Sequence, residues 1–172
     1  MSENLKSIEV SNYDVAFSEN GYVALNNLLE RKSYSSIFIL VDNHTKALCL
    51  AYFLQHFEDL NEISVIEIPA NEINKHLDTC RDVWQKLSDM GADRKSLLIN
   101  LGGGVVTDLG GFVASTFKRG IDFVNIPTSL LSMVDASVGG KTGIDLGGLK
   151  NQIGVIVNPQ LVIVDSEFLK TL

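Results

Sequence analysis

The residues with the clearest chemical potential are a run of three glycines followed by a threonine and an aspartate. Gly102, Gly103 and Gly104 come directly after the apolar segment SLLINL, and Thr107 and Asp108 fall in the helix-like segment that follows. At such a strand–turn–helix junction, unhindered backbone N–H groups and the positive helix end favour the phosphates of a dinucleotide. Thr107 occupies the third glycine position of the G-x-G-x-x-G fingerprint, so an ordinary tight turn remains open as the alternative.

A second group of polar side chains gathers in the last third of the chain. Three cations, an amide and a carboxylate stand around glycine-rich turns: Arg119, Asp135, Lys141, Lys150 and Asn151. In a chain with a formal net charge of −7, this group predicts a small anionic substrate that carries phosphate or carboxylate. A solvated charged loop is the alternative. We expect the glycine-rich segment 128–154 to be a binding loop rather than a core element.

Residues 135–142, DASVGGKT, end like a P-loop for nucleoside triphosphates, and LVIVD at 161–165 has the form of a magnesium-binding strand. The first position of a P-loop must be glycine, but here it is Asp135, whose carboxylate would face the phosphates. The preceding residues, TSLLSMVDAS, are typical of a short helix rather than the buried strand that a P-loop follows. We therefore predict that this stretch is not a P-loop.

Two candidate binding sites earlier in the chain have weaker support from their residue types alone. Asp42 ends the strand-like run SSIFILVD, where a carboxylate can bind ribose hydroxyls or cap the next helix. Glu72 and Lys75 are three residues apart at a helix start, which by itself predicts only a surface ion pair.

Composition limits the partners and the compartment. A length of 172 residues with 45% hydrophobic content predicts one globular domain. The acidic balance argues against nucleic-acid binding, no apolar run reaches the roughly 20 residues of a membrane span, and the N-terminus lacks the form of a signal peptide. We therefore expect a cytoplasmic protein. The cysteines and histidines lack metal-ligand spacing, so we expect buried free thiols and no metal site: Cys49, Cys80, His44, His56 and His76.

Alternating strands and helices must position these residues. A hairpin-like pair (SIEVS, YDVAFS) is followed by helix GYVALNNLLERK, strand SSIFILVD, helix HTKALCLAYFLQHF and strand EISVIEIPA. One apolar helical face between 75 and 90 predicts core residues: Leu77, Cys80, Val83, Trp84, Leu87 and Met90. SLLINL, DFVNIP, VIVNP and LVIVD read as short buried strands, so we predict a doubly wound, mostly parallel α/β domain.

The long segment GGGVVTDLGGFVASTFKRGIDFVNIPTSLLSMVDASVGGKTGIDLGGLKNQIG closely resembles the centre of 3-dehydroquinate synthases, which cyclise the sugar acid phosphate DAHP. The resemblance extends through FILVDNHTK, IPANEINK and SEFLKTL, and so covers nearly the whole chain. It implies the Rossmann-like N-terminal domain of that family, spanning residues 1–172. In this family SVGGKTGI is a substrate loop, whose lysine meets the sugar phosphate.

Carried over position by position, the resemblance implies two sets of site residues. The NAD set comprises Asp42, Glu72, Lys75, Gly103, Gly104, Val105, Val106, Thr107, Asp108, Thr128, Ser129, Phe168, Leu169, Lys170 and Thr171. The substrate set comprises Arg119, Asp135, Lys141, Lys150 and Asn151, and both lysines are counted with the cofactor as well. Asp108 is expected to contact NAD, so its replacement should weaken NAD+ binding with little effect on stability. His44 and Asn71 depart from the family's usual asparagine and glycine near the adenosine end.

The resemblance also implies NAD+ as a catalyst, a catalytic zinc or cobalt, and a homodimer in the full-length enzyme. The family continues beyond FLKTL into a helical domain that supplies a glutamate and two histidines to the metal, so we expect this chain alone to be inactive. The first alternative is a sugar phosphate cyclase of secondary metabolism, of the 2-epi-5-epi-valiolone or 2-deoxy-scyllo-inosose synthase type. Polyol dehydrogenases share the GGG-x-x-x-D turn but not GGKTG, and a non-enzymatic NAD-binding module also remains open.

Overall fold

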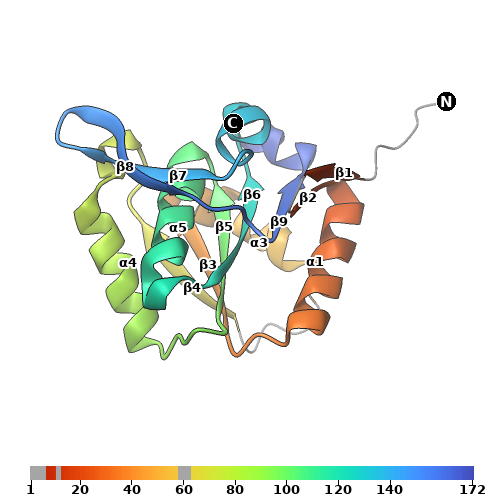
Figure 1. Ribbon diagram of the computed structural model, residues 1–172. Helices are drawn as coiled ribbons and strands as arrows, with labels where there is room; N and C mark the ends of the chain where they lie inside the picture. The colour runs from red at the N-terminus through yellow and green to blue at the C-terminus, as the bar shows by residue number, and fades with distance from the viewer. Residues whose placement is uncertain (1–6, 11–12, 58–62) are drawn as a thin grey trace.

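The computed structural model describes residues 7–10, 13–57 and 63–172 (Figure 1). Within them, a seven-stranded sheet has the order β1-β2-β9-β6-β5-β3-β4, and every neighbouring pair is parallel except β1 with β2. The strands of this sheet are β1 (Ser7–Val10), β2 (Tyr13–Phe17), β3 (Ile37–Asp42), β4 (Ile63–Ile68), β5 (Leu97–Gly102), β6 (Asp122–Pro127) and β9 (Leu161–Val164). The predicted mostly parallel α/β sheet is confirmed, and so is the hairpin-like pair at its edge; the connecting residues 11–12 lie outside the described part.

Helices cover both faces of the sheet (Figure 1). They are α1 (Ser18–Lys32), α2 (Asn43–Leu48), α3 (Leu50–Leu54), α4 (Leu77–Asp89) and α5 (Gly104–Thr116), with the short turns η1 (Glu72–Asn74), η2 (Phe117–Arg119), η3 (Ser132–Ala136) and η4 (Ser166–Thr171). One core cluster joins α4 and α5 to one face of the sheet, and a second joins α1, α3 and η4 to the other. Because both faces are covered, all six residues of β5 are buried, as its continuous apolar run predicts.

The carboxyl ends of the parallel strands meet at one edge of the sheet. Asp42 ends β3, Gly102 ends β5 and Pro127 ends β6. In open α/β sheets, ligands bind outside this edge. The fold therefore brings the glycine turn, the start of α5 and the turn η3 to one region.

A separate two-stranded sheet lies beside this edge. Its strands β7 (Lys141–Leu146) and β8 (Leu149–Ile156) pair with each other and not with the seven-stranded sheet. The segment 128–154, predicted to be a binding loop rather than a core element, therefore contains two regular strands in its second half. The expected buried strand VIVNP is wrong, because its first residues end β8 on the surface, where Ile156 is 80% exposed.

The amphipathic face of α4 is confirmed in its middle and wrong at its ends. Cys80, Val83 and Leu87 are buried, whereas Leu77 and Met90 are exposed. Leu77 is the first residue of α4 and Met90 is its C-cap, so both stand at the ends of the helix, and a periodic pattern does not fix where a helix ends. Cys80 and Cys49 are free and buried, as expected.

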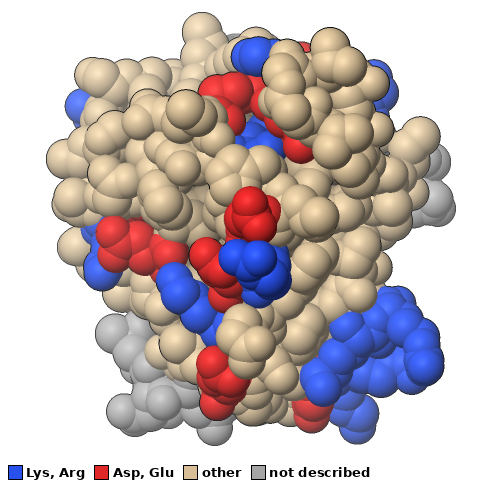
Figure 2. Space-filling view, turned by 90° about the vertical axis from the view of Figure 1, so that its left-hand side faces the viewer, with Lys and Arg blue, Asp and Glu red and all other residues tan. Residues whose placement is uncertain are grey.

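The surface of the described residues carries mixed charge. Figure 2 shows acidic and basic side chains interspersed over the middle of the side on which α4 and the β7–β8 hairpin lie, with a group of basic side chains together at its lower right edge. Among the described helices, none is both long and apolar enough to cross a membrane.

Candidate functional site

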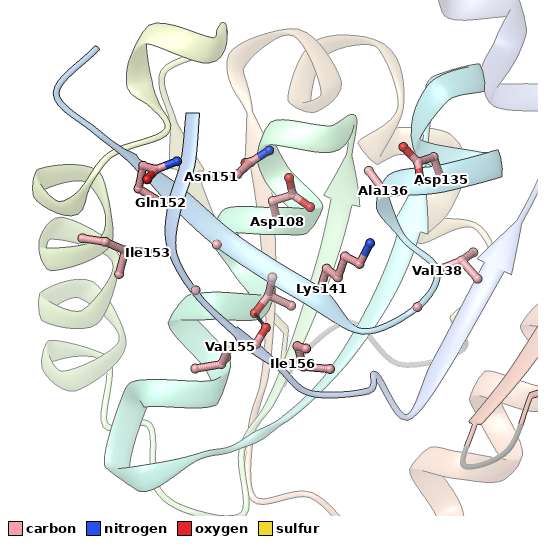
Figure 3. Close-up of a pocket in the computed structure, with 14 residues that line it drawn as sticks. Asp108, Asp135, Ala136, Val138, Lys141, Asn151, Gln152, Ile153, Val155 and Ile156 are labelled. Atoms are coloured by element: carbon pink, nitrogen blue, oxygen red, sulfur yellow. Dashed lines mark hydrogen bonds between the residues drawn. The ribbon is translucent and has the colours of Figure 1, made fainter. Parts of the chain in front are cut away.

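A cavity of about 650 Å³ lies between the start of α5, the turn η3 and the β7–β8 hairpin (Figure 3). Four of the polar residues expected at a site line it: Asp108, Asp135, Lys141 and Asn151. Bare backbone at Gly139, Gly143 and Gly154 forms part of its wall. The cavity thus joins the glycine-turn helix to the lysine of GGKTG, two features that are 30 residues or more apart in the chain.

The glycines at the start of α5 leave the backbone of the helix end uncovered by side chains. A Cβ at Gly102 would meet the Val106 side chain at 2.5 Å, so only glycine lets the helix pack back on its strand here. Gly103 is the N-cap, in an extended conformation and without a side-chain cap. A Cβ at Gly103 would lie 3.5 Å from Ser129 Oγ, and one at Gly104 would lie 3.5 Å from Ala136 Cβ. The first-turn N–H groups of α5 therefore stand at this end without a side chain to cap them.

The other residues of this turn hold it in place. Thr107 is buried, and its hydroxyl donates to the Gly103 and Gly104 carbonyls at 3.3 Å. The Thr128 N–H donates to the Gly102 carbonyl at 3.0 Å, and the Ser129 hydroxyl lies 2.9 Å from the Ser132 hydroxyl. Val105 and Val106 form the first turn of the helix, with Val106 fully buried.

Lys75 joins the cofactor-side residues to the hairpin. Its side chain is only 4% exposed, and its Nζ donates to Asp108 Oδ2 at 2.5 Å and to Asn151 Oδ1 at 2.7 Å. The expected surface pair of Glu72 with Lys75 is therefore wrong. Glu72 instead pairs with Lys150, with 3.2 Å between Oε1 and Nζ, and both side chains are substantially exposed. Burial raises the pKa of the Asp108 carboxyl, and the Lys75 ammonium opposes that rise.

Lys141 and Asp135 face the cavity from two different elements. Lys141 begins β7 and Asp135 belongs to η3, and both side chains are exposed. In Figure 3 the Lys141 side chain extends from its strand into the space bounded by Asp108 and Asp135. Because Lys141 starts a strand and not a helix, DASVGGKT lacks the helix N-terminus of a P-loop, and the prediction against one is confirmed.

The turn before Lys141 depends on a residue that sequence reasoning missed. Gly139 and Gly140 have φ values of 89° and 69°, a backbone region that favours glycine. The Gly139 N–H donates to the Tyr13 hydroxyl oxygen at 2.9 Å, and Tyr13 is itself buried. Tyr13 lies on β2, so no local signal links it to this turn.

The remaining NAD-set residues lie outside this cavity. Asp42 caps α2 by accepting from the Thr45 N–H at 2.7 Å, which confirms the capping alternative. Phe168 is buried against Tyr52, and Thr171 bonds to the Phe168 carbonyl at 2.7 Å. Leu169 is partly buried in the same core, and exposed Lys170 pairs with Glu167. The carboxylate of the LVIVD stretch, Asp165, is buried and accepts from the Tyr22 and Tyr52 hydroxyls, so it offers no magnesium site.

Arg119 does not join the cluster in which we expected it. It ends η2, beyond the C-terminus of α5, and does not line the cavity. The helix has 13 residues, so its two ends are about 20 Å apart at about 1.5 Å per residue. Arg119 therefore lies at the opposite end of α5 from the cavity, and its role toward a substrate stays a prediction.

The described residues offer no metal-ligand set. No group of three or more histidine, cysteine, aspartate or glutamate residues among them is placed to hold a metal ion. The zinc or cobalt implied by the resemblance does not fit the residues in this part of the chain.

Comparison with known proteins identifies relatives over most of the chain. The family model described as the N-terminal part of 3-dehydroquinate synthase matches residues 65–172. The 3-dehydroquinate synthase of Parabacteroides distasonis is 44% identical over 148 residues, covering 86% of this chain and 42% of the relative. That of Pyrococcus furiosus is 45% identical over 148 residues, covering 86% of this chain and 44% of the relative. The chain thus spans less than half the length of these relatives.

Solved structures show the same fold. The 2-epi-5-epi-valiolone synthase of Streptomyces hygroscopicus, with NAD+ and Zn²⁺ bound, has a TM-score of 0.80 and 31% identity, covering 98% of this chain and 47% of that one. A 2-deoxy-scyllo-inosose synthase complexed with carbaglucose-6-phosphate, NAD+ and Co²⁺ has a TM-score of 0.84 at 22% identity, covering 95% and 46%. These matches confirm the expected Rossmann-like fold of the N-terminal domain.

Proposed function

Because this chain belongs to the 3-dehydroquinate synthase family, we propose that it is the NAD-binding half of an enzyme that cyclises DAHP to 3-dehydroquinate with loss of phosphate. The observation that carries this proposal is the cavity in which Asp108, one turn beyond the uncapped start of α5, faces the Lys141 side chain. One wall suits a dinucleotide and the other suits an anionic sugar. A site with both is what an NAD-dependent reaction of a sugar phosphate requires.

The start of α5 is the proposed site of the NAD+ diphosphate. The uncapped N–H groups after Gly103 and the helix dipole favour negative charge there, and no acidic side chain occupies the first turn. NAD+ bound there would supply hydride acceptance and return. Asp108, one turn further along the helix, lines the same cavity and carries a proposed cofactor contact.

Lys141 is the proposed phosphate-binding group of the substrate. Its ammonium is exposed at the cavity wall, and a charge-assisted contact to a phosphate is about twice as strong as a neutral one. Asp135 and Asn151 line the same cavity and can bind sugar hydroxyls. Lys150 is engaged with Glu72, so it must leave that exposed pair in order to contact a ligand. Arg119 has no proposed contact within this cavity.

The metal seen in the relatives has no ligands among the described residues, and we derive no step through it. We also propose that the full-length enzyme is cytoplasmic and forms a homodimer. Light scattering of the full-length protein tests the dimer. A cyclase of secondary metabolism is the second candidate, because one such enzyme matches 98% of this chain at 31% identity. The higher identity to 3-dehydroquinate synthases, 44% and 45%, favours the first candidate.

An added carboxylate at the helix start tests the cofactor site. In Gly103→Asp the new Cβ has room, and aspartate is a good N-cap, so the domain should keep or gain stability. Its charge would repel the diphosphate, and we expect the dissociation constant for NAD+ measured by calorimetry to rise about ten- to a hundredfold.

Gly148→Asp is the matched control. It makes the same charge change at a turn where a Cβ meets nothing within 4 Å, and NAD+ affinity should not change. Titration of ATP with Mg²⁺ alongside tests the P-loop alternative, for which we expect no magnesium-dependent binding. Equal NAD+ affinity in wild type and Gly103→Asp would refute the proposed cofactor site.

A further inference from the structure

The β7–β8 hairpin is not hydrogen-bonded into a larger sheet. It shares no backbone ladder with the seven-stranded sheet, and most of β8 is exposed. Beneath it, β7 rests on α5, where Ile144 is fully buried and a Cβ at Gly111 would collide with Thr142. That packing holds the middle of β7 but leaves the turn end of the hairpin to be held by other contacts.

Those contacts converge on Lys75. The Asp145 N–H, near the end of β7, donates to the Lys75 carbonyl oxygen at 2.8 Å. The Lys75 ammonium donates to Asn151 Oδ1 on β8 and to Asp108 Oδ2 on α5, at 2.7 Å and 2.5 Å. Lys75 is 3% exposed, so these bonds are shielded from water and are worth more than surface contacts. The neighbouring Lys150–Glu72 pair is exposed and contributes little.

The backbone conformation of Asn151 allows its contact with Lys75. Its φ is 52°, a left-handed conformation that asparagine tolerates better than most residues. In this conformation its N–H donates to Asp145 Oδ1 at 2.8 Å, while its side-chain oxygen accepts from Lys75. Figure 3 shows Asn151 and Asp108 near one another at the end of the cavity away from Val138.

We propose that Lys75 is a positioning residue that latches the β7–β8 hairpin to the helix of the glycine turn. Asp108 fixes the ammonium on the α5 side, and Asn151 receives it on the hairpin side. The latch holds the cavity wall that carries Lys141 at a set distance from the wall that carries Asp108. Its existence rests on these contacts alone; its value for orienting substrate against cofactor rests on the proposed function.

Amide hydrogen exchange at Asp145 reports directly on the latch. Its N–H bonds to a backbone carbonyl that every Lys75 variant retains, so its exchange requires the hairpin to leave the η1 turn. In Asn151→Gly, which keeps the positive φ and leaves the Lys75–Asp108 pair intact, we expect exchange at Asp145 to accelerate about ten- to a hundredfold, the loss of one charge-assisted bond. Exchange at Ile99 in the central strand β5 should not change.

Three further variants separate a latch from a general loss of stability. Lys75→Met should accelerate exchange at Asp145, and the double variant Lys75→Met/Asn151→Gly should exceed the faster single variant by less than about threefold, because both remove the same bond. Asn151→Asp keeps an acceptor and tolerates the same φ, so exchange should stay within about threefold of wild type. Lys86→Met, which removes a surface bond to the Glu67 carbonyl, is the control and should leave Asp145 unchanged.

Unchanged exchange at Asp145 in Asn151→Gly would overturn the latch. It would also be overturned if the double variant showed the product of the accelerations caused by Lys75→Met and Asn151→Gly alone. Equal acceleration at Asp145 and Ile99 in Asn151→Gly would also overturn it, because that result reports global unfolding. NAD+ titration of the same proteins keeps the two proposals apart. If wild type does not bind NAD+, the cofactor proposal fails while the exchange pattern still decides the latch.

Discussion

Replacing Asp108 by alanine should lower the stability of this domain as well as weaken ligand binding. The Asp108 side chain is 18% exposed and its partner Lys75 is 4% exposed. Alanine therefore leaves a buried ammonium whose only remaining side-chain acceptor in the described structure is Asn151. The expectation from sequence is a loss of NAD+ affinity with little change in stability. It considers the proposed cofactor contact of Asp108 but not its ion pair with Lys75.

The magnitude follows from the environment of the pair. Removing one partner of a buried ion pair costs about 3–5 kcal/mol. Asn151 still accepts from Lys75 and Asp108 is partly solvated, so we expect a lower cost of about 2–3 kcal/mol. For a domain of this size each kcal/mol lowers the melting temperature by about 2–4 °C, which gives a fall of roughly 5–10 °C.

Scanning calorimetry at neutral pH measures this fall directly. The matched control is Asp78→Ala, which breaks a pair with Arg81 in which both side chains are about 70% exposed, at 72% and 69%. Its melting temperature should change by no more than about 2 °C. A melting temperature of Asp108→Ala equal to that of the control would refute the reasoning, and Asp108 would then serve a ligand alone.

The pH dependence of stability tests a separate consequence of burying Asp108, one that reduces the advantage of wild type as the pH rises. Burial raises the pKa of Asp108 above its ordinary value of 3.8, so the folded state holds this proton more tightly than the unfolded state. The stabilisation linked to that proton is complete below pH 3.8 and is lost as the pH rises through the folded pKa. Wild type should therefore lose stability relative to Asp108→Ala as the pH rises through this window. A constant difference across the window would contradict the raised pKa.

Three further predictions concern residues outside this pair. Burial raises the pKa of the Cys80 thiol to about 12, so iodoacetamide at pH 8 should label it only in unfolded protein, as mass spectrometry will detect. A Cβ at Gly110 would overlap the Asn100 side-chain oxygen, so Gly110→Ala should lower the denaturation midpoint by an amount equivalent to about 2 kcal/mol or more. Tyr13→Phe leaves the Gly139 N–H without its acceptor and should lower the melting temperature by about 2–4 °C.

The alternation of strands and helices was predictable because each element carries its own signal. The run SLLINL is buried on both faces, and the glycines after it mark the turn and the helix start, so β5 and α5 were located correctly. Asp135 at the first P-loop position was enough to exclude a nucleoside triphosphate loop. These conclusions need only the periodicity of burial and the backbone freedom of glycine, both of which are local properties.

The arrangement of the site was not predictable in this way. Lys75 contacts residues 33 and 76 positions further along the chain, and Tyr13 contacts a turn 126 positions away. Arg119 and Asp108 share one stretch of sequence, yet α5 separates them by its length. The elements could be located from the sequence because each depends on neighbours along the chain. Which charges face one another depends on the packing of the hairpin on α5, and that packing is visible only in the folded chain.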